Sequence, residues 1–254
     1  MYIDSTANLE HTVSDIMGKT FNALLISGDL THNGTLISYQ KLQKNLKCIK
    51  SDIHVMPGNY DDKSNLSQAF DTELQSAFQL GDWQNITLDS VQMNKVSGLL
   101  NKDRLRFLGD TISNSTAKYI FVCLHHLIIP MNSDWDGELS LENPKDFFAV
   151  VERHSNVKAI AWGHAYHSEI FNYKDVSLFS CPSTALQFNG SDNISYNHYT
   201  LHSDRSEEPR LNSSHVVISY AVFCLKKKNQ HLPLPPSPPP PMLCSHPYSS
   251  AKPH

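Results

Sequence analysis

Short apolar runs alternate with longer amphipathic segments along most of the chain. Residues 21–27 and 118–124 are largely apolar and end beside Gly28 and His125, which is typical of strands buried on both faces. Residues 5–18 carry Leu, Val and Ile at helical spacing and predict a helix. Further helices are predicted at 36–46, 64–80, 101–112 and 143–151, and further single strands at 53–56 and 157–162. Residues 83–88 and 92–96 are expected to form an antiparallel pair of strands, and residues 170–173 and 176–179 a hairpin. This alternation predicts a layered α/β domain.

The pattern weakens after about residue 190. Residues 215–225 are apolar and are expected to form a last strand, although the pattern does not place it in a sheet. Residues 226–254 are rich in proline and include the run Pro238–Pro241, so we expect a disordered tail with polyproline character. Such a tail could bind an SH3- or WW-type partner, but an unstructured tail without a partner is the simpler expectation.

Composition narrows the classes of function. Hydrophobic residues make up 40% of the 254 residues, which is enough for a core, and the net charge of −4 provides no basic surface for a nucleic acid polymer. No apolar stretch is long enough to cross a membrane, and the first residues do not resemble a signal peptide. The five cysteines form no CxxC pair, which favours free thiols in a reducing compartment. We therefore expect a cytoplasmic protein that does not associate with membranes.

Four predicted strands end in a residue that can bind a metal ion. These residues are Asp29, Asn59, His125 and His164. A strand delivers its last residue to the edge of the sheet, and in layered α/β folds ligands collect at that edge. One carboxylate, one amide and two imidazoles would form a mixed oxygen and nitrogen site that suits Mn, Fe or Zn. Each of these residues alone would be an ordinary turn or core residue, but the four together favour a metal site.

The motifs around these residues resemble those of a known superfamily. GDLTH at 28–32, PGNYDD at 57–62, CLHH at 123–126 and GHAYH at 163–167 resemble the GD, GNHD/E, HH and GHxH motifs of the calcineurin-like metallophosphoesterases. The segments 141–164 and 181–188 resemble the bacterial-type (class III) 3′,5′-cyclic AMP phosphodiesterases. The resemblance covers roughly residues 1–190 and implies a four-layer α/β/β/α sandwich. We expect this domain to span residues 1–225, with residues 226–254 as the tail.

The resemblance also implies roles for individual residues. In the family, two divalent metal ions hold the phosphate and activate a hydroxide. Asp29 would bridge the two ions, and Asn59, His125 and His164 would complete the shell of the second ion. His126 would orient a ligand or the phosphate. Asn59, Tyr60 and His126 are therefore the candidate catalytic residues.

The chain departs from the family pattern on the side of the first metal ion. It has no N-terminal DxH motif, so we expect the sandwich to lack its first strand and the domain to be incomplete at its N-terminus. Tyr166 stands at the position of the second histidine of GHxH, and His167 could replace it only if the turn were reshaped. Tyr60 stands at the GNHD histidine, and a tyrosine, with an ordinary pKa of about 10, is a poor acid or base at neutral pH. We therefore expect the chain to bind at most one metal ion tightly, where the family binds two, and to be weakly active or inactive.

Two functions follow from this interpretation. The first is a metal-dependent phosphodiester hydrolase that acts on a small molecule, a 3′,5′-cyclic nucleotide such as cyclic AMP. The alternative is a degenerate phosphoesterase fold of weak or no activity that binds a nucleotide or a protein. An incomplete copy of an active enzyme would also account for the missing motif.

Overall fold

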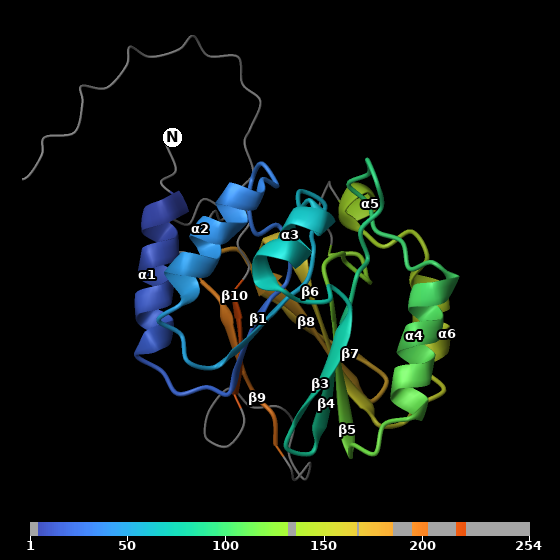
Figure 1. Cartoon of the computed structure of the whole chain (residues 1–254). Coiled ribbons are helices and arrows are strands. Elements are labelled where there is room, and N and C mark those ends of the chain that lie inside the picture. The colour runs from blue at the N-terminus through green and yellow to red at the C-terminus, as the bar shows by residue number, and fades with distance from the viewer. Residues whose placement is uncertain (1–4, 132–135, 167, 185–194, 203–216, 222–254) are drawn as a thin grey trace, which may run out of the picture.

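The computed structural model describes residues 5–131, 136–166, 168–184, 195–202 and 217–221 (Figure 1). Its helices are α1 (Ser5–Met17), α2 (Leu36–Leu46), α3 (Lys63–Phe70), α4 (Lys102–Ser113), α5 (Asp136–Leu139) and α6 (Pro144–Val151). Its strands are β1 (Ala23–Ile26), β2 (Asp52–Val55), β3 (Ser76–Leu80), β4 (Trp83–Leu88), β5 (Tyr119–Leu124), β6 (Val157–Tyr166), β7 (Ile170–Tyr173), β8 (Val176–Pro182), β9 (Asn197–Thr200) and β10 (Val217–Ala221).

The strands form two sheets. The first sheet has the order β2-β1-β10-β9, with β9 antiparallel to its neighbour, and the second has the order β3-β4-β5-β6-β8-β7, with β3 and β7 antiparallel at the two edges. The strands between these edges run parallel, so their carboxyl ends lie at the same end of each sheet. Asp29, Asn59 and His125 follow the strands β1, β2 and β5, and His164 lies near the end of β6.

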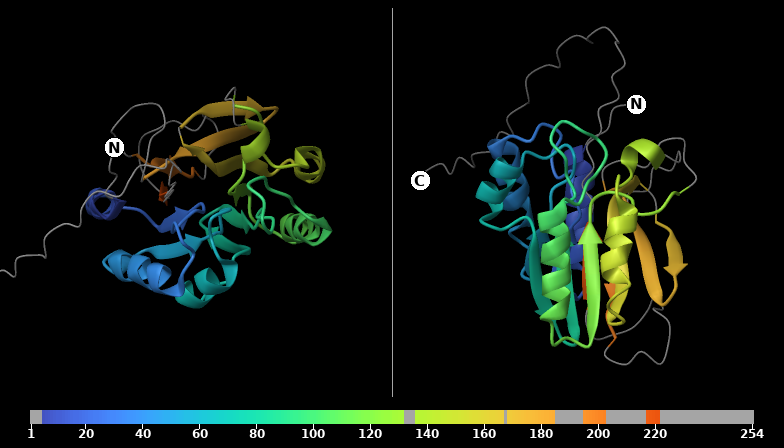
Figure 2. Two further views of the ribbon diagram at one scale, coloured as in Figure 1. Left: turned by 90° about the horizontal axis from the view of Figure 1, so that it is seen from above. Right: turned by 90° about the vertical axis from the view of Figure 1, so that its right-hand side faces the viewer.

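Helices cover the outer faces of both sheets, and the inner faces pack on each other (Figure 1). Helices α1, α2 and α3 bury Ile16, Tyr39 and Leu66 in one cluster with Leu24 and Ile26 of β1. Seen from the right-hand side of Figure 1, α4 and α6 lie in front of the six-stranded sheet (Figure 2). This arrangement is the expected α/β/β/α sandwich. The expected missing strand rests on where the sequence begins and stays a prediction.

Strand β5 shows why the central strands are apolar throughout. Ile120, Val122 and Leu124 face the helices α4 and α6, whereas Phe121 and Cys123 face the other sheet. Because both faces of the strand are covered, every position from Tyr119 to Leu124 is buried.

The structure corrects two of the expected elements. The predicted helix 64–80 ends at Phe70, because Asp71 adopts the left-handed conformation (φ 49°) and its N–H bonds back to Ser67. Residues 76–80 instead form β3, which pairs with β4. The predicted strand 92–96 is a loop, in which Asn94 has a φ of 59°. The antiparallel partner of β4 is therefore β3.

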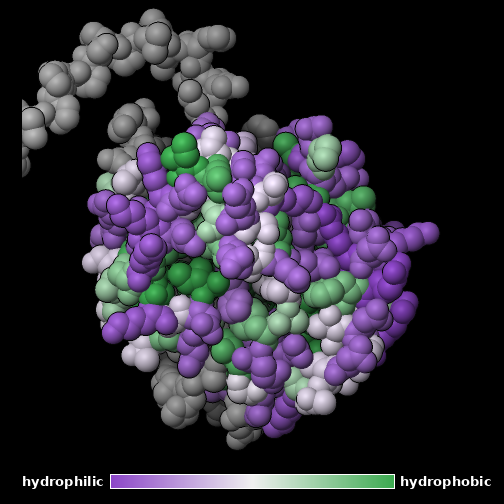
Figure 3. All heavy atoms as spheres, viewed as in Figure 1, coloured by the Kyte–Doolittle hydropathy of each residue, from purple (hydrophilic) through white to green (hydrophobic). Residues whose placement is uncertain are grey.

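The C-terminal part of the domain contains strands that the pattern did not place. Strand β10 lies within the apolar stretch 215–225 and inserts between β1 and β9. The expected proline-rich tail and its SH3- or WW-type partner lie outside the described residues. The face shown in Figure 3 is mostly hydrophilic, with hydrophobic side chains in small separate groups. Within the described ranges, no helix combines the length and the apolar character that crossing a membrane requires.

Candidate metal site

The four predicted ligands meet where the ends of the two sheets face each other. Asp29 and Asn59 come from the four-stranded sheet, and His125 and His164 come from the six-stranded sheet. Asp29, His125 and His164 are at most 1% exposed, whereas Asn59 is half-buried. The site is therefore built between the sheets and is closed on the side of the core.

His125 lies at the centre of this group. Its Nδ1 atom is 2.7 Å from the carbonyl oxygen of Ser27, and a carbonyl can only accept, so Nδ1 carries the proton of this hydrogen bond. Its Nε2 atom faces two oxygen atoms, at 3.2 Å from Oδ1 of Asn59 and 3.5 Å from Oδ2 of Asp29. In neutral His125 this nitrogen presents a lone pair, so three electron-pair donors point at a shared space. That arrangement suits a cation.

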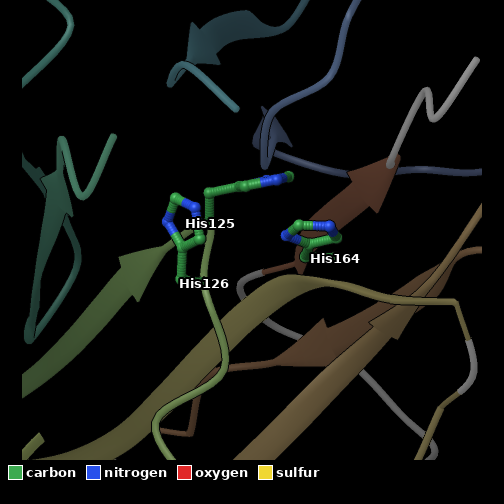
Figure 4. A group of neighbouring side chains, drawn as sticks. All are labelled: His125, His126 and His164. Atoms are coloured by element: carbon green, nitrogen blue, oxygen red, sulfur yellow. The ribbon is translucent and has the colours of Figure 1, made fainter. Parts of the chain in front are cut away.

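His164 completes the group. Its ring stacks on that of His125 with centroids 4.6 Å apart (Figure 4), and it lies 5.6 Å from the ring of His126. Ligand atoms of His125, His126 and His164 lie within 4.8 Å of one another. Among the histidine, cysteine and acidic side chains of the described ranges, these three form a group that could hold a metal ion. The strand ends therefore bring His164 to the same space as His125.

The backbone at the site is held in unusual conformations. Asp29 (φ 56°) and His164 (φ 58°) both lie in the left-handed region, which costs a residue other than glycine about 1–3 kcal/mol. Hydrogen bonds compensate at Asp29, whose Oδ1 accepts from the Tyr60 N–H at 3.0 Å. Such strain is concentrated at functional sites, and here it falls on two of the four predicted ligands.

Glycine allows these segments to approach one another. A Cβ atom on Gly58 would lie 2.2 Å from Oδ1 of Asp29 and 2.4 Å from its backbone nitrogen. Gly28 has a φ of 103°, and a Cβ atom there would lie 2.3 Å from Nδ1 of His125. Both positions therefore exclude any side chain.

The charges of Asp29 and His125 stabilise each other. Burial by itself raises the pKa of Asp29, but the nearby His125 and His164 outweigh it and hold this pKa below its ordinary value. Burial likewise disfavours the charged form of His125, yet the carboxylate of Asp29 raises the pKa of that imidazole above its ordinary value. The ionised carboxylate of Asp29 thus favours a positive charge beside it, which a metal cation would supply.

The donor set fits a divalent metal ion. Asp29 offers a carboxylate oxygen, Asn59 an amide oxygen, and His125 and His164 imidazole nitrogens, with no thiolate among them. Mixed oxygen and nitrogen ligands of this kind suit first-row divalent ions. The hydrogen bond from His125 to Ser27 also fixes the tautomer and the ring orientation, as second partners of metal-binding histidines commonly do.

His126 lies beside the site, but its ring is already engaged. Nδ1 is 2.7 Å from the hydroxyl of Ser90, and Nε2 is 3.0 Å from the carbonyl oxygen of Val96. Nε2 donates to the carbonyl, so Nδ1 accepts from Ser90 and neither nitrogen is available to a metal ion without loss of a hydrogen bond. Burial and the charges of His125 and His164 lower the pKa of His126 well below its ordinary value. Its expected role in catalysis stays a prediction.

Asp61 is a buried residue of the site to which the sequence analysis assigned no role. Its carboxylate accepts from the backbone N–H groups of Leu30 (3.0 Å) and Gly58 (2.9 Å) and from the hydroxyl of Tyr39 (2.8 Å). It therefore ties the turn that carries Asp29 to the turn that carries Asn59. Burial and the negative charge of Asp29 raise the pKa of Asp61 to about 6.

The sequence analysis also missed Ser27 and Ser90, the hydrogen-bond partners of His125 and His126. Nothing in the sequence marks them, because each lies dozens of residues from its histidine. Asp61 could have been found, since it lies within the PGNYDD motif. Tyr60 is half-buried next to Asn59, and its ring lies 6.3 Å from that of His32. His167 lies outside the described residues, so its expected role as a ligand stays a prediction.

Comparisons with known proteins agree on one family. The model of the calcineurin-like phosphoesterases matches residues 3–167. A protein of Ruthia magnifica subsp. Calyptogena magnifica, named as a probable cyclic nucleotide phosphodiesterase, is 46% identical over 202 residues, which cover 80% of this chain and 86% of that protein. The 3′,5′-cyclic adenosine monophosphate phosphodiesterase CpdA of Pseudomonas aeruginosa is 25% identical over 190 residues, which cover 73% of this chain and 70% of CpdA.

Solved structures share the fold at low sequence identity. The structure of a dimetal phosphatase from Danio rerio matches with a TM-score of 0.59 at 12% identity, covering 70% of this chain and 78% of the phosphatase. At this identity the match supports the layered architecture alone.

Proposed function

The chain belongs to the calcineurin-like phosphoesterase family, and we propose that it hydrolyses a 3′,5′-cyclic nucleotide, with cyclic AMP as the preferred substrate. Enzymes of this family are hydrolases that use divalent metal ions. The observation that carries the proposal is the convergence of Asp29, Asn59 and His125 on one buried space. The names of the relatives in Ruthia magnifica and Pseudomonas aeruginosa support the class of substrate.

Asp29, Asn59, His125 and His164 would hold the metal ion, and their donor atoms favour manganese, iron or zinc. A divalent ion bound there would polarise a phosphoryl oxygen and make water a better nucleophile at neutral pH. Asp29 is the one charged side chain among these four residues, so with a divalent ion bound the site would carry a net positive charge that attracts a negatively charged phosphodiester. The described ranges contain one group of side chains that could hold a metal ion, and we therefore propose one tightly bound ion.

The other residues of the site position the ligands. Tyr60 donates its backbone N–H to Asp29, and Ser27 accepts from His125 and fixes the nitrogen that faces the metal ion. Asp61 holds the turns of both sequence motifs together. Ser27 and Asp61 are buried, so solvent water competes little for their hydrogen bonds, and these contacts would hold the ligands in place before substrate arrives.

The proposal is tested with the whole chain freed of metal and then supplied with Mn²⁺, Fe²⁺ or Zn²⁺. Cyclic AMP and bis(4-nitrophenyl) phosphate serve as substrates, and we expect metal-dependent hydrolysis of both. Asp29→Asn should lower kcat by about 100-fold or more, because it removes the negative ligand. Asp103→Asn is the matched control, since this carboxylate lies at an exposed position of α4 and pairs only with Arg106 among the ion pairs of the described residues.

Hydrolysis that survives Asp29→Asn would contradict the proposed site. Metal-loaded chain that binds cyclic AMP without hydrolysing it would instead support the alternative, a nucleotide-binding module built on the same fold. Hydrolysis of bis(4-nitrophenyl) phosphate but not of cyclic AMP would support phosphodiesterase activity and contradict cyclic AMP as the substrate.

A further inference from the structure

The turns that carry Asp29 and Asn59 also bring together two aromatic side chains that do not belong to the candidate ligand set. His32 lies three residues after Asp29, and Tyr60 directly follows Asn59. Their rings lie 6.3 Å apart between centroids and are tilted by 32°. His32 is exposed and Tyr60 is half-buried, whereas the imidazoles of His125 and His164 are fully buried. The side chain of His32 is therefore accessible to a substrate that approaches from solvent.

The backbone holds this pair in a defined position relative to the ligands. Asp61 accepts from the N–H of Leu30 and from the N–H of Gly58, which joins the two turns on either side of the pair. The hydroxyl of Thr31 accepts from the N–H of Gly34 at 3.1 Å and tightens the turn that carries His32. Although the side chain of His32 is exposed, its backbone is thus part of the same frame as Asp29.

Hydrolysis of a cyclic nucleotide creates a need that the buried residues do not meet. The ribose oxygen leaves as a strongly basic alkoxide unless it receives a proton, and imidazole is the side chain best suited to give one near neutral pH. His126 uses both ring nitrogens within the protein, and His125 is committed to Ser27 and to the ligand space. A tyrosine phenol such as that of Tyr60 is a weaker acid at neutral pH.

We propose that His32 is a catalytic residue that protonates the leaving ribose oxygen, with the ring of Tyr60 packing against the imidazole to position it. The inference rests on the proposed function. In the step, the oxygen of water bonds to phosphorus and releases a proton to solvent. The bond from phosphorus to the ribose oxygen breaks, its electron pair stays on that oxygen, and the N–H of protonated His32 supplies the proton. Neutral His32 then takes a proton from solvent, so the net reaction consumes one water.

The test compares two substrates that differ in their need for a proton donor. The ribose oxygen of cyclic AMP requires protonation, whereas 4-nitrophenolate leaves bis(4-nitrophenyl) phosphate as a stable anion. His32→Gln should lower kcat for cyclic AMP by about 100-fold or more and kcat for the aryl diester by less than about threefold. KM for cyclic AMP and the metal content should stay at the wild-type values, because His32 is not a ligand.

The matched control is His11→Gln, which replaces an exposed histidine on α1 and should leave both rates unchanged. Tyr60→Phe keeps a ring beside His32 and should retain the difference between the two substrates. Equal losses on both substrates, no loss on cyclic AMP, or a change confined to KM would each overturn the role of His32. A wild-type chain that hydrolyses neither substrate would instead contradict the proposed function, and the inference would fall with it.

Discussion

His125 connects the two sheets through Ser27, since Nδ1 of the imidazole lies 2.7 Å from the carbonyl oxygen that follows β1. The histidine comes from the six-stranded sheet and the serine from the four-stranded sheet. The same ring faces Asp29 and Asn59 with its other nitrogen. One side chain therefore both holds the sheets together at their carboxyl ends and lines the space for the metal ion.

Replacing His125 should accordingly affect stability and metal binding together. His125→Ala leaves the buried charge of Asp29 without its partner, and breaking such a pair costs about 3–5 kcal/mol. Urea denaturation of the metal-free chain measures this loss, and metal analysis of the folded variant should show that binding is abolished. His154→Ala, a change at a half-buried histidine after α6, should cost far less. Equal losses in the two variants would contradict the role given to His125.

Gly58 offers a test of how closely the turns approach. In Gly58→Ala the new methyl group would lie 2.2 Å from Oδ1 of Asp29, so the carboxylate or the turn must move. We expect loss of metal binding and a destabilisation of more than about 2 kcal/mol, measured by metal titration and urea denaturation.

Gly109→Ala is the matched control for this variant. It lies within α4, where the new methyl group would meet only Val150 at an ordinary 3.6 Å. Alanine favours a helix over glycine, so this variant should be more stable by about 0.5–1 kcal/mol and should bind metal normally. A Gly58→Ala chain that behaves in the same way would show that the turns can separate.

The sequence located the candidate ligands at the ends of strands more accurately than it located some of the elements around them. Asp29 and His125 follow the short apolar strands β1 and β5, which are recognisable because all their residues are buried. Asn59 follows β2, an edge strand that is only partly buried. The helix expected at 64–80 was wrong beyond Phe70, because its end depends on the left-handed Asp71, and Ser76–Leu80 is a strand only through its pairing with β4. Local spacing does not encode that partner.

The supporting hydrogen bonds could not be predicted for a similar reason. Ser90 reaches His126 across 36 residues and Ser27 reaches His125 across 98 residues, so neither contact leaves a local pattern. The same holds for Asp61, whose bonds to Leu30 and Tyr39 depend on the packing of α2 beside two turns. The candidate metal ligands are residue types that the sequence itself marks, whereas the residues that orient them are recognised only in three dimensions.

His126 should be separable from the ligands by substitution. His126→Leu removes the hydrogen bonds to Ser90 and Val96, which should cost about 1–3 kcal/mol, but it should leave the metal content unchanged. In His164→Asn the asparagine can adopt the left-handed backbone of that position but offers no imidazole, so this variant should not bind the metal ion. Metal analysis of both purified variants decides the matter. Loss of the metal ion in His126→Leu would indicate that His126 is a ligand.

Tyr39 tests the frame behind the ligands. Its hydroxyl donates to Asp61 at 2.8 Å and accepts from the N–H of Asp62 at 3.0 Å. Tyr39→Phe leaves both groups without this partner, and Asp61 is buried, so we expect a loss of about 1–3 kcal/mol in urea denaturation. Tyr173→Phe removes a hydroxyl that bonds to Glu152 at the surface and should cost much less. An unchanged free energy of unfolding in Tyr39→Phe would mean that the turns held by Asp61 do not depend on this hydroxyl.

The number of metal ions per chain tests the ligand set as a whole. Asp29, Asn59, His125 and His164 supply four donors for one ion, and the described ranges contain no second group of three histidine, cysteine or acidic side chains that could hold another. We therefore expect about one tightly bound equivalent of Mn²⁺, Fe²⁺ or Zn²⁺ per chain, measured by elemental analysis after dialysis. Asn59→Ala should weaken this binding, because it removes the amide oxygen that faces His125. Two tightly bound equivalents would contradict the single-ion proposal. They would require further ligands from residues outside the described ranges, such as His167.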